Sequence, residues 1–308
     1  MTSVVTPSDS ASAHRGRSRV MATLGADVAR AWSRLSIATA SGVGSHHRVN
    51  EDSYSPLDGI APVYLVADGV GGGAMASWAS RHLVTSVHRR LERRRADAAT
   101  LSKALLDADR EIARGIAHRS GASGAATVVA CAAVDLLRAS WLVAWVGDCR
   151  AYVLDRNGDA KPITRDDTYR NLDEVPPPGG SPDDPARMIG NGAVSAPNVV
   201  RVQLGWDEML VLASDGVHKF VDAAAVARYL RDDAPLARRC QRIVDAARSN
   251  GSEDDATVLV VHRRREPRAT LARHAIAAML VTAALTFGVM HWLSPAVEAP
   301  RTTMEVAQ

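Results

Sequence analysis

Carboxylates at the ends of apolar runs constrain this chain more than any other feature of its sequence. They occur in five groups beside glycine or another small residue: Asn50-Glu51-Asp52, Asp68-Gly69-Val70-Gly71-Gly72-Gly73, Gly147-Asp148, Ser214-Asp215-Gly216 and Ser252-Glu253-Asp254-Asp255. A carboxylate that emerges from an apolar strand lies near the low-dielectric core, where its charge needs a partner. No lysine or arginine stands beside Asp68 or Asp215. If several such groups meet at one end of a sheet, they repel one another unless cations lie between them.

The donor chemistry indicates which cations these are. Carboxylate and carbonyl oxygens select hard ions such as Mg²⁺ or Mn²⁺, and a glycine after the aspartate lets the backbone turn so that its carbonyl comes close. A lone Asp-Gly pair is usually only a turn, so the prediction rests on the five groups together. Zinc is not expected, because the chain has no Cys-x-x-Cys or His-x-x-x-His pair.

Hydrophobic periodicity predicts the secondary structure. Apolar, β-branched runs indicate strands at 35–40, 63–67, 127–134, 141–146, 151–154, 199–204, 209–213 and 257–262. Apolar residues at three- and four-residue spacing indicate helices at 75–93, 101–119, 223–230 and 236–247. This pattern predicts an α+β domain over residues 35–263, in which helices cover sheets.

Two other segments lack a clear pattern. Residues 1–34 are rich in Ser, Ala and Arg, and they predict a disordered N-terminal segment. The stretch 168–199 contains the run Pro-Pro-Pro-Gly-Gly and fits either a substrate-facing flap or a plain linker.

The C-terminal part suggests a membrane anchor. Residues 275–293 are nearly all apolar, and about 20 such residues span a bilayer as a helix. Five arginines precede this stretch, partly in a basic linker at 264–274, and only Arg301 follows it, in a short tail at 294–308. The positive-inside rule then predicts a single-pass protein of the inner (cytoplasmic) membrane with its large domain in the cytoplasm. A buried, alanine-rich terminal helix is the alternative.

Charge and cysteine content exclude some classes of partner. The formal net charge is only +3 and aromatic residues make up 4% of the chain. Surfaces that bind single-stranded nucleic acids combine basic grooves with stacked aromatic residues, so no nucleic-acid partner is expected. Three cysteines without paired spacing predict a reducing compartment rather than a disulfide framework.

The five acidic groups, in this order, resemble the protein phosphatase 2C family of metal-dependent phosphoprotein phosphatases, and its bacterial branch in particular. The likeness runs from about residue 36 to residue 262. It is carried by the segments Asn50-Glu51-Asp52-Ser53, Val66-Ala67-Asp68-Gly69-Val70-Gly71-Gly72, Gly147-Asp148-Cys149-Arg150-Ala151-Tyr152, Thr164-Arg165-Asp166-Asp167-Thr168, Ser214-Asp215-Gly216-Val217 and Asp254-Asp255-Ala256-Thr257. Few folds share this order of motifs.

The resemblance implies a four-layer α-β-β-α sandwich with two central antiparallel sheets. It also implies two Mn²⁺ or Mg²⁺ ions with a bridging water that attacks phosphoserine or phosphothreonine in proteins phosphorylated by a cognate kinase. The positions that match the family's metal ligands are Asp52, Asp68, the Gly69 carbonyl, Asp215 and Asp254. Glu51 and Asp148 match groups that orient metal-bound water. No protein nucleophile is needed, and no arginine stands six residues after a cysteine, as it does in thiol phosphatases.

One departure from the family pattern concerns the phosphate contact. The family carries an arginine three residues before the position of Asn50, but this chain has His47 there and Arg48 next to it. A one-residue shift along a strand turns a side chain to the opposite face. Arg48 therefore contacts the phosphate only if a bulge re-aims it, and His46 or His47 is the alternative.

A second departure concerns a third metal ion. Many bacterial members place an aspartate shortly before the segment that corresponds to residues 121–127, but no acid stands between Glu111 and Thr127 here. The sequence therefore gives a third ion little support, unless water and Asp215 alone hold it.

A pseudophosphatase, the same fold used as a membrane-tethered module that binds phosphoproteins, is the competing interpretation. His47 favours it slightly. The four retained aspartates argue against it, because a dead site has no reason to keep costly carboxylates together. A structural membrane protein whose acids are turn residues is the remaining alternative.

Overall fold

The structure is a computed structural model that describes residues 20–30, 33–57, 63–72, 74–92, 96–118, 123–135, 139–192, 194–265 and 268–293. The chain divides into two units, Met1–Arg265 and Glu266–Gln308.

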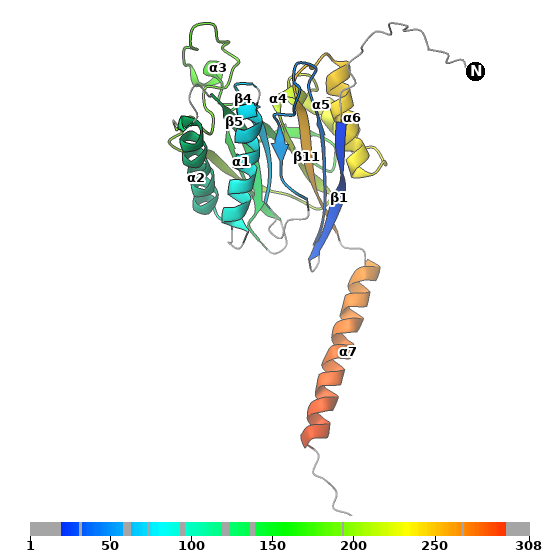
Figure 1. Cartoon of the computed structure of the whole chain (residues 1–308). Coiled ribbons are helices and arrows are strands. Elements are labelled where there is room, and N and C mark those ends of the chain that lie inside the picture. Colours follow the sequence, from blue (N-terminus) through cyan, green and yellow to red (C-terminus); the bar gives the residue numbers. More distant parts are fainter. Residues whose placement is uncertain are drawn as a thin grey trace, which may run out of the picture. The chain divides into compact units, whose positions relative to one another are not determined.

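Two antiparallel sheets form the centre of the first unit (Figure 1). The six-stranded sheet has the order β1 (Val20–Arg30), β2 (Ser33–Gly42), β11 (Ala256–Arg265), β10 (Glu208–Ala213), β7 (Arg150–Leu154) and β8 (Ala160–Pro162). The five-stranded sheet has the order β3 (Ser53–Tyr54), β4 (Val63–Val70), β5 (Ala125–Ala133), β6 (Ser140–Val146) and β9 (Asn198–Gln203).

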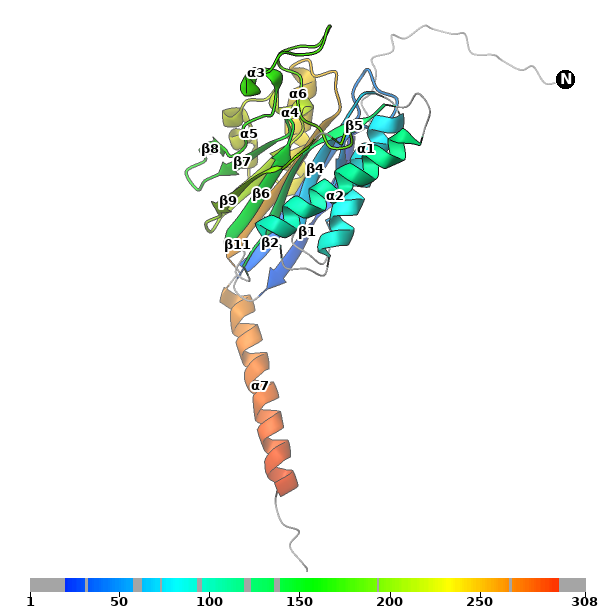
Figure 2. The ribbon, with the colours of Figure 1, turned by 90° about the vertical axis from the view of Figure 1, so that its left-hand side faces the viewer.

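Helices cover the outer faces of both sheets. The pair α1 (Ala74–Leu91) and α2 (Ala98–Ala117) lies on the five-stranded sheet, on the side that faces the viewer in Figure 2. The pair α5 (Ala223–Leu230) and α6 (Leu236–Ser249) covers the six-stranded sheet, while α3 (Tyr169–Leu172) and α4 (Asp215–His218) are short turns of helix. The predicted α+β fold with two antiparallel sheets is therefore confirmed.

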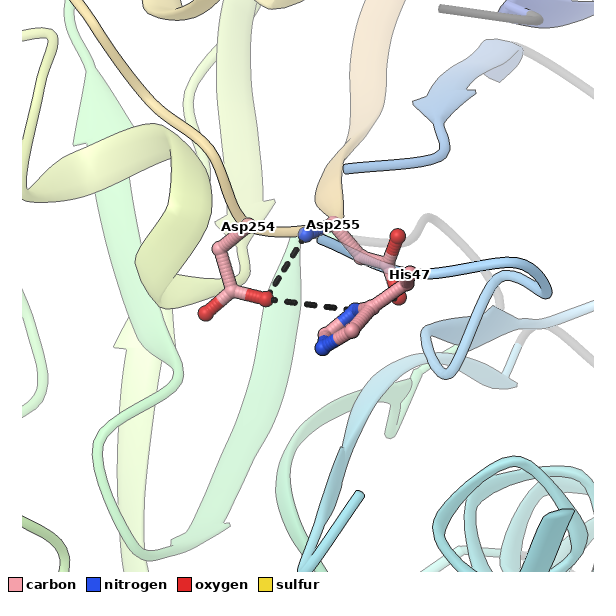
Figure 3. A group of neighbouring side chains, drawn as sticks. All are labelled: His47, Asp254 and Asp255. Atoms are coloured by element: carbon pink, nitrogen blue, oxygen red, sulfur yellow. Dashed lines mark hydrogen bonds and ion pairs between the residues drawn. The ribbon is translucent and has the colours of Figure 1, made fainter. Parts of the chain in front are cut away.

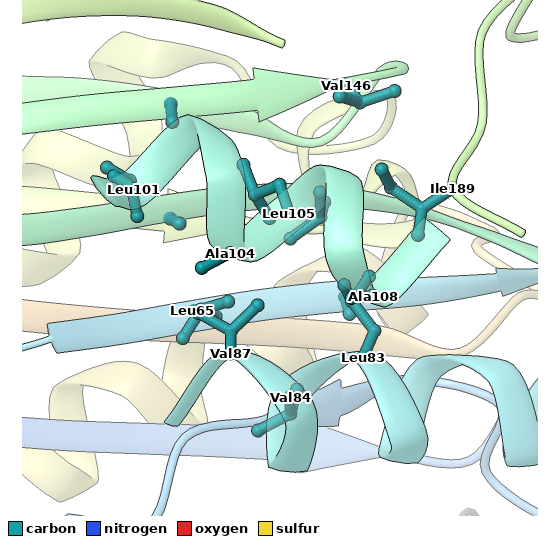
Figure 4. Close-up of a cluster of buried hydrophobic side chains, with 14 of the residues drawn as sticks. Leu65, Leu83, Val84, Val87, Leu101, Ala104, Leu105, Ala108, Val146 and Ile189 are labelled. Carbon is teal, nitrogen blue, oxygen red and sulfur yellow. The ribbon is translucent and has the colours of Figure 1, made fainter. Parts of the chain in front are cut away.

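Three clusters of buried apolar side chains hold the layers together, and β4 shows how the sequence serves two of them. Leu65 and Ala67 pack under α1 and α2 (Figure 4), whereas Tyr64 and Val66 face the other sheet. Successive residues of a strand point to opposite faces. Because both faces of β4 are covered, the strand is apolar throughout instead of alternating.

All eight predicted strands and the four predicted helices of the domain are present, with shifted ends. The sequence analysis missed β1, β3, β8, α3 and α4. The largest difference is β1, which lies in the segment 1–34 for which disorder was predicted; residues 1–19 lie outside the described residues. Disorder is wrong for Val20–Arg30, because this stretch pairs with β2 from Val20 opposite Gly42 to Arg30 opposite Ser33.

The second unit contains helix α7 (Arg268–Leu293), which begins inside the linker predicted at 264–274. Within the part of the chain that the structure describes, no helix meets the length and apolarity that crossing a membrane requires. The predicted inner-membrane location is therefore wrong, and the predicted transmembrane helix at 275–293 and the membrane partner find no support in the described residues.

Candidate metal centre

Strand register brings the predicted acids to one edge of the two sheets. The end of β10 pairs with the start of β11 and with the start of β7. Asp215 lies two residues after the end of β10, Asp254 two residues before β11 and Asp148 two residues before β7. Because these strand ends are paired, the three aspartates lie close together. In the other sheet, Asp68 lies near the end of β4, and Asp52 precedes β3, which pairs with β4.

A pocket of about 490 Å³ opens at this edge. The predicted site residues that line it are Glu51, Asp68, Gly69, Asp148, Asp215 and Asp254. Asp52 is buried and lines a neighbouring groove, and its Oδ2 accepts a 2.8 Å hydrogen bond from the hydroxyl of Ser214, the residue before Asp215. The structure therefore gathers all four predicted metal-binding aspartates in one region.

Burial and mutual repulsion raise the pKa of most of these carboxyls. Burial is the largest cause at Asp52 and Asp68, whose pKa values are raised well above their ordinary range, and neighbouring carboxylates add to the effect. Burial and then Asp215 raise the pKa of Asp148 to about 6, and the same two causes raise the pKa of Asp254. The shifts show that negative charge accumulates here without enough compensation.

Asp215 differs because Lys219 lies beside it. The Lys219 Nζ is 2.7 Å from Asp215 Oδ2 and 3.4 Å from Asp148 Oδ2. Burial is the largest single influence and raises the pKa of Asp215, but the charge and hydrogen bond of Lys219, together with smaller effects of Asp68 and His218, lower the pKa overall. The sequence interpretation that no lysine accompanies Asp215 is wrong, because one turn of helix brings residues four apart onto the same face.

Two carboxylate oxygens of the site have no hydrogen-bond partner among the described residues: Asp52 Oδ1 and Asp215 Oδ1, both buried. A buried carboxylate oxygen without a donor is costly, and a divalent cation would satisfy it. Together with Asp68, Asp254 and the Gly69 carbonyl, the donor set consists of oxygen alone. Such a set fits Mg²⁺ or Mn²⁺ better than zinc.

Gly69 has no room for a side chain. A Cβ at this position would lie 2.6 Å from the carbonyl oxygen of Ala76 and 2.8 Å from that of Glu51. The glycine thus lets the start of α1 and the segment before β3 approach the backbone of β4, which keeps Glu51 and Asp68 at the same pocket.

Asp255 is a structural residue of the site that sequence reasoning missed. Its Oδ1 accepts a 2.6 Å hydrogen bond from the Gly44 N–H, and its Oδ2 accepts one of 2.6 Å from the Glu51 N–H. The same Oδ2 lies 2.9 Å from His47 Nδ1. Asp255 therefore clamps residues 44–51 onto the turn before β11. No local pattern reveals this contact, because the partners are about two hundred residues apart in the chain.

His47, Asp254 and Asp255 lie close enough together to share an ion (Figure 3). The oxygens of Asp255, however, already face the donors of the clamp. Asp254 Oδ1 accepts a 2.7 Å hydrogen bond from the Asp255 N–H and lies 3.7 Å from His47 Nδ1. This trio therefore positions Asp254 at the pocket, and it is not needed as a separate ion site.

Arg48, the predicted phosphate contact, does not line the pocket of about 490 Å³, and neither does Asp52. Arg48 is exposed and lines the neighbouring groove together with Arg81 and Tyr54. His46 and His47 line the carboxylate pocket instead. A phosphate contact by Arg48 stays a prediction.

The segment 168–199 contributes to the pocket. Thr168 forms a bridge with Pro185, and both Asp184 and Pro185 line the pocket wall. Of the two interpretations that the sequence left open, this placement favours a flap at the pocket over a plain linker.

Cysteine chemistry does not operate at this site. All three cysteines are buried. Burial raises the pKa of Cys240 to about 12, and it raises the pKa values of Cys131 and Cys149 as well. A buried, protonated thiol is inert as a nucleophile.

Known proteins share both sequence and fold with this chain. A family model described as Protein phosphatase 2C matches residues 39–176. The chain is 32% identical over 244 residues to "Probable protein phosphatase 2C 74" of Oryza sativa subsp. japonica, which covers 66% of this chain and 57% of the rice protein. It is 26% identical over 237 residues to "Serine/threonine phosphatase stp" of Listeria innocua, which covers 71% of this chain and 91% of that protein.

Solved structures agree on the fold. The catalytic domain of the serine threonine protein phosphatase PstP, crystallised with two manganese ions, superposes with a TM-score of 0.64 at 22% identity, covering 75% of this chain and 99% of that one. PppA of Pseudomonas aeruginosa gives a TM-score of 0.64 at 24% identity, covering 75% and 98%. The family match, the sequence relatives and the shared fold agree in one respect: the chain is similar in sequence and fold to proteins of the protein phosphatase 2C family.

Proposed function

We propose that this protein is a metal-dependent phosphatase that hydrolyses phosphoserine and phosphothreonine in proteins. The observation that carries the proposal is the pair of buried oxygens, Asp52 Oδ1 and Asp215 Oδ1, that have no hydrogen-bond partner among the described residues. Asp215 lines the pocket together with further carboxylates, and Asp52 lines the groove beside it. The match of residues 39–176 to the Protein phosphatase 2C family model and the buried state of every cysteine support it. The chain spans less than two thirds of the rice relative's length, so the activity of the whole protein is part of the proposal.

The residues divide into ligands and positioning groups. Two Mn²⁺ or Mg²⁺ ions would be held by Asp52, Asp68, the Gly69 carbonyl, Asp215 and Asp254. When bound, such ions supply an activated water and offset the charge of the attacked phosphoryl group. Glu51 and Asp148 line the same pocket, and we assign them the role of accepting hydrogen bonds from water. Asp255 keeps Glu51 in place through the Glu51 N–H.

Hydrolysis assays on the purified full chain test the function. With Mn²⁺, we expect release of phosphate from p-nitrophenyl phosphate and from phosphoserine and phosphothreonine peptides, and little from a phosphotyrosine peptide. An excess of EDTA should remove the activity. Tight binding of the phosphopeptides without any turnover would support the pseudophosphatase instead.

Two neighbouring substitutions locate the phosphate contact. His47 lines the pocket and is fixed by Asp255, whereas Arg48 lines the adjacent groove. We therefore expect His47→Ala to raise KM for a phosphopeptide about tenfold, since a hydrogen bond to a charged group contributes roughly 1.5–3 kcal/mol. Arg48→Ala should change KM less than threefold. Steady-state kinetics measure both KM values. A larger rise in KM for Arg48→Ala than for His47→Ala would identify Arg48 as the phosphate contact.

A further inference from the structure

Lys219 is an unexpected cation in an acidic pocket. Among the described residues that line the pocket, no other lysine and no arginine is present. Its side chain is 41% exposed, whereas the side chain of Asp148, one of its two partners, is only 3% exposed. The ammonium group therefore lies where the pocket opens, between a buried carboxylate of the β6–β7 turn and the carboxylate that begins α4.

The position of this ammonium is fixed by the backbone around it. The Lys219 N–H donates a 3.0 Å hydrogen bond to the Asp215 carbonyl, which holds residue 219 on the turn of α4. His218 Nε2 lies 2.8 Å from the carbonyl oxygen of Asp148, so α4 is attached to the turn that carries Asp148. Lys219 thus joins two segments that are about seventy residues apart, which an ordinary surface pair within one helix does not do.

Asp215 divides its two oxygens between different partners. Oδ2 faces Lys219 at 2.7 Å, whereas Oδ1 is buried and has no hydrogen-bond partner in the part of the chain that the structure describes. An ion can therefore bind at Oδ1 without displacing the lysine. The Oδ2 atoms of Asp215 and Asp148, by contrast, both face the positively charged ammonium group of Lys219.

We propose that the Lys219 ammonium is a built-in cation that takes the place of a third divalent ion between Asp148 and Asp215. This inference rests on the proposed two-ion function. The pair Asp148 and Asp215 would otherwise be two facing carboxylates, which attract a hard cation. The Lys219 ammonium is covalently attached to the chain, so the positive charge between the two carboxylates does not depend on a loosely bound ion. The protein then binds two divalent ions and no third.

Counting bound manganese tests the proposal. The full chain is titrated with Mn²⁺, and bound ions are counted by calorimetry and by the electron paramagnetic resonance signal of the free ion. The variants are Lys219→Met, which keeps the length of the stem and removes the charge, and Lys219→Arg, which keeps the charge. Lys161→Met is the matched control, because Lys161 also faces an aspartate, Asp155 at 3.9 Å, but does not line the pocket.

We expect two ions in the wild type, in Lys219→Arg and in Lys161→Met. Lys219→Met should take up a third ion, with a dissociation constant in roughly the millimolar range typical of weak oxygen sites. The double variant Lys219→Met with Asp148→Asn should lose that third ion again.

Several outcomes would overturn the inference. A third ion in the wild type shows that Lys219 does not exclude it, and this result stands even if Lys219→Met fails to fold. An unchanged count of two in a folded Lys219→Met shows that the lysine is only an ion pair. The proposed function is judged separately, because a wild type that binds two ions and hydrolyses no phosphoester would refute the enzyme while leaving the ion count intact.

Discussion

Asp68→Asn should abolish hydrolysis and at the same time make the metal-free protein more stable. The side chain belongs to the proposed ligand set and lines the pocket. Metal ions lower hydrolytic barriers by several kcal/mol, and about 1.4 kcal/mol corresponds to a factor of ten in rate. Loss of a ligand is therefore expected to lower kcat/KM by roughly 1000-fold or more.

The gain in stability follows from the charges around Asp68. Burial raises its pKa most, and Asp215, Asp52, Asp148 and Asp254 raise it further. Its negative charge at neutral pH is thus unfavourable in the folded state, whereas asparagine has nearly the same shape and no charge. Because a raised pKa means that ionisation costs folding free energy, we expect the variant to have a higher free energy of unfolding and a higher Tm than the metal-free wild type.

Two further variants sharpen the comparison in metal-free buffer. Asp215→Asn should lose activity equally but gain no stability, because Asp215 is paired with Lys219. Asp107→Asn is the control outside the site. Lys103, Arg110 and Arg90 together lower the pKa of Asp107 to about 2 against the opposing effect of burial, so this variant should keep its activity and lose some stability. Calorimetry with EDTA measures all three. An Asp68→Asn protein that hydrolyses phosphopeptides near the wild-type rate would refute the ligand assignment.

Manganese should stabilise the folded chain strongly at pH 7.5 and hardly at pH 5. A ligand at 100 times its dissociation constant stabilises the native state by about 2.7 kcal/mol. For a domain of this size, this corresponds to a rise in Tm of roughly 5–10 °C. The effect depends on pH because the ligands must be ionised to bind a cation, and the pKa values of Asp52, Asp68 and Asp254 are raised, while that of Asp148 is raised to about 6.

In the metal-free protein, the same carboxyls have the opposite effect on the pH dependence of stability. A carboxyl whose folded pKa is raised holds more protons in the folded state than in the unfolded state, so its contribution to stability falls as pH rises from about 4 through the folded pKa. Two buried histidines act in the other direction: burial lowers the pKa values of His218 and His262 to about 4, so their contribution rises between about pH 4 and 6.5. The difference in Tm between wild type and Asp68→Asn isolates the carboxyl effect.

Thermal scans at half-unit steps from pH 5 to pH 7.5, with EDTA and with Mn²⁺, measure both effects. The Mn²⁺-dependent rise in Tm should grow over this range, and the deficit of metal-free wild type relative to Asp68→Asn should grow with it. A manganese effect that is absent at pH 7.5, or equally large at pH 5, would contradict a site made of these carboxyls.

The apolar pattern determined the core of the fold. Strand β4 was found because both of its faces are buried, which leaves a run of apolar residues that ends at Asp68. Helices α5 and α6 were found because their apolar residues repeat at helical spacing. The edge strands β1 and β8 were missed because what defines them is pairing with a neighbour, and their own sequences carry weak patterns. The apolar stretch at 275–293 shows the converse error, since composition alone suggested a membrane span.

For the site, the sequence by itself determined which residue types could hold a hard cation, because aspartates at strand ends mark the points where charge leaves an apolar core. Only the tertiary structure decided which other side chains join them. Three features show this: the Asp255 clamp, the position of His47 rather than Arg48 at the pocket, and the bridge from Lys219 to Asp148. Each depends on contacts between distant segments or on a change in the direction of the chain. Local sequence carries no record of such contacts, because register between strands and the course of the loops bring those groups within reach of one another.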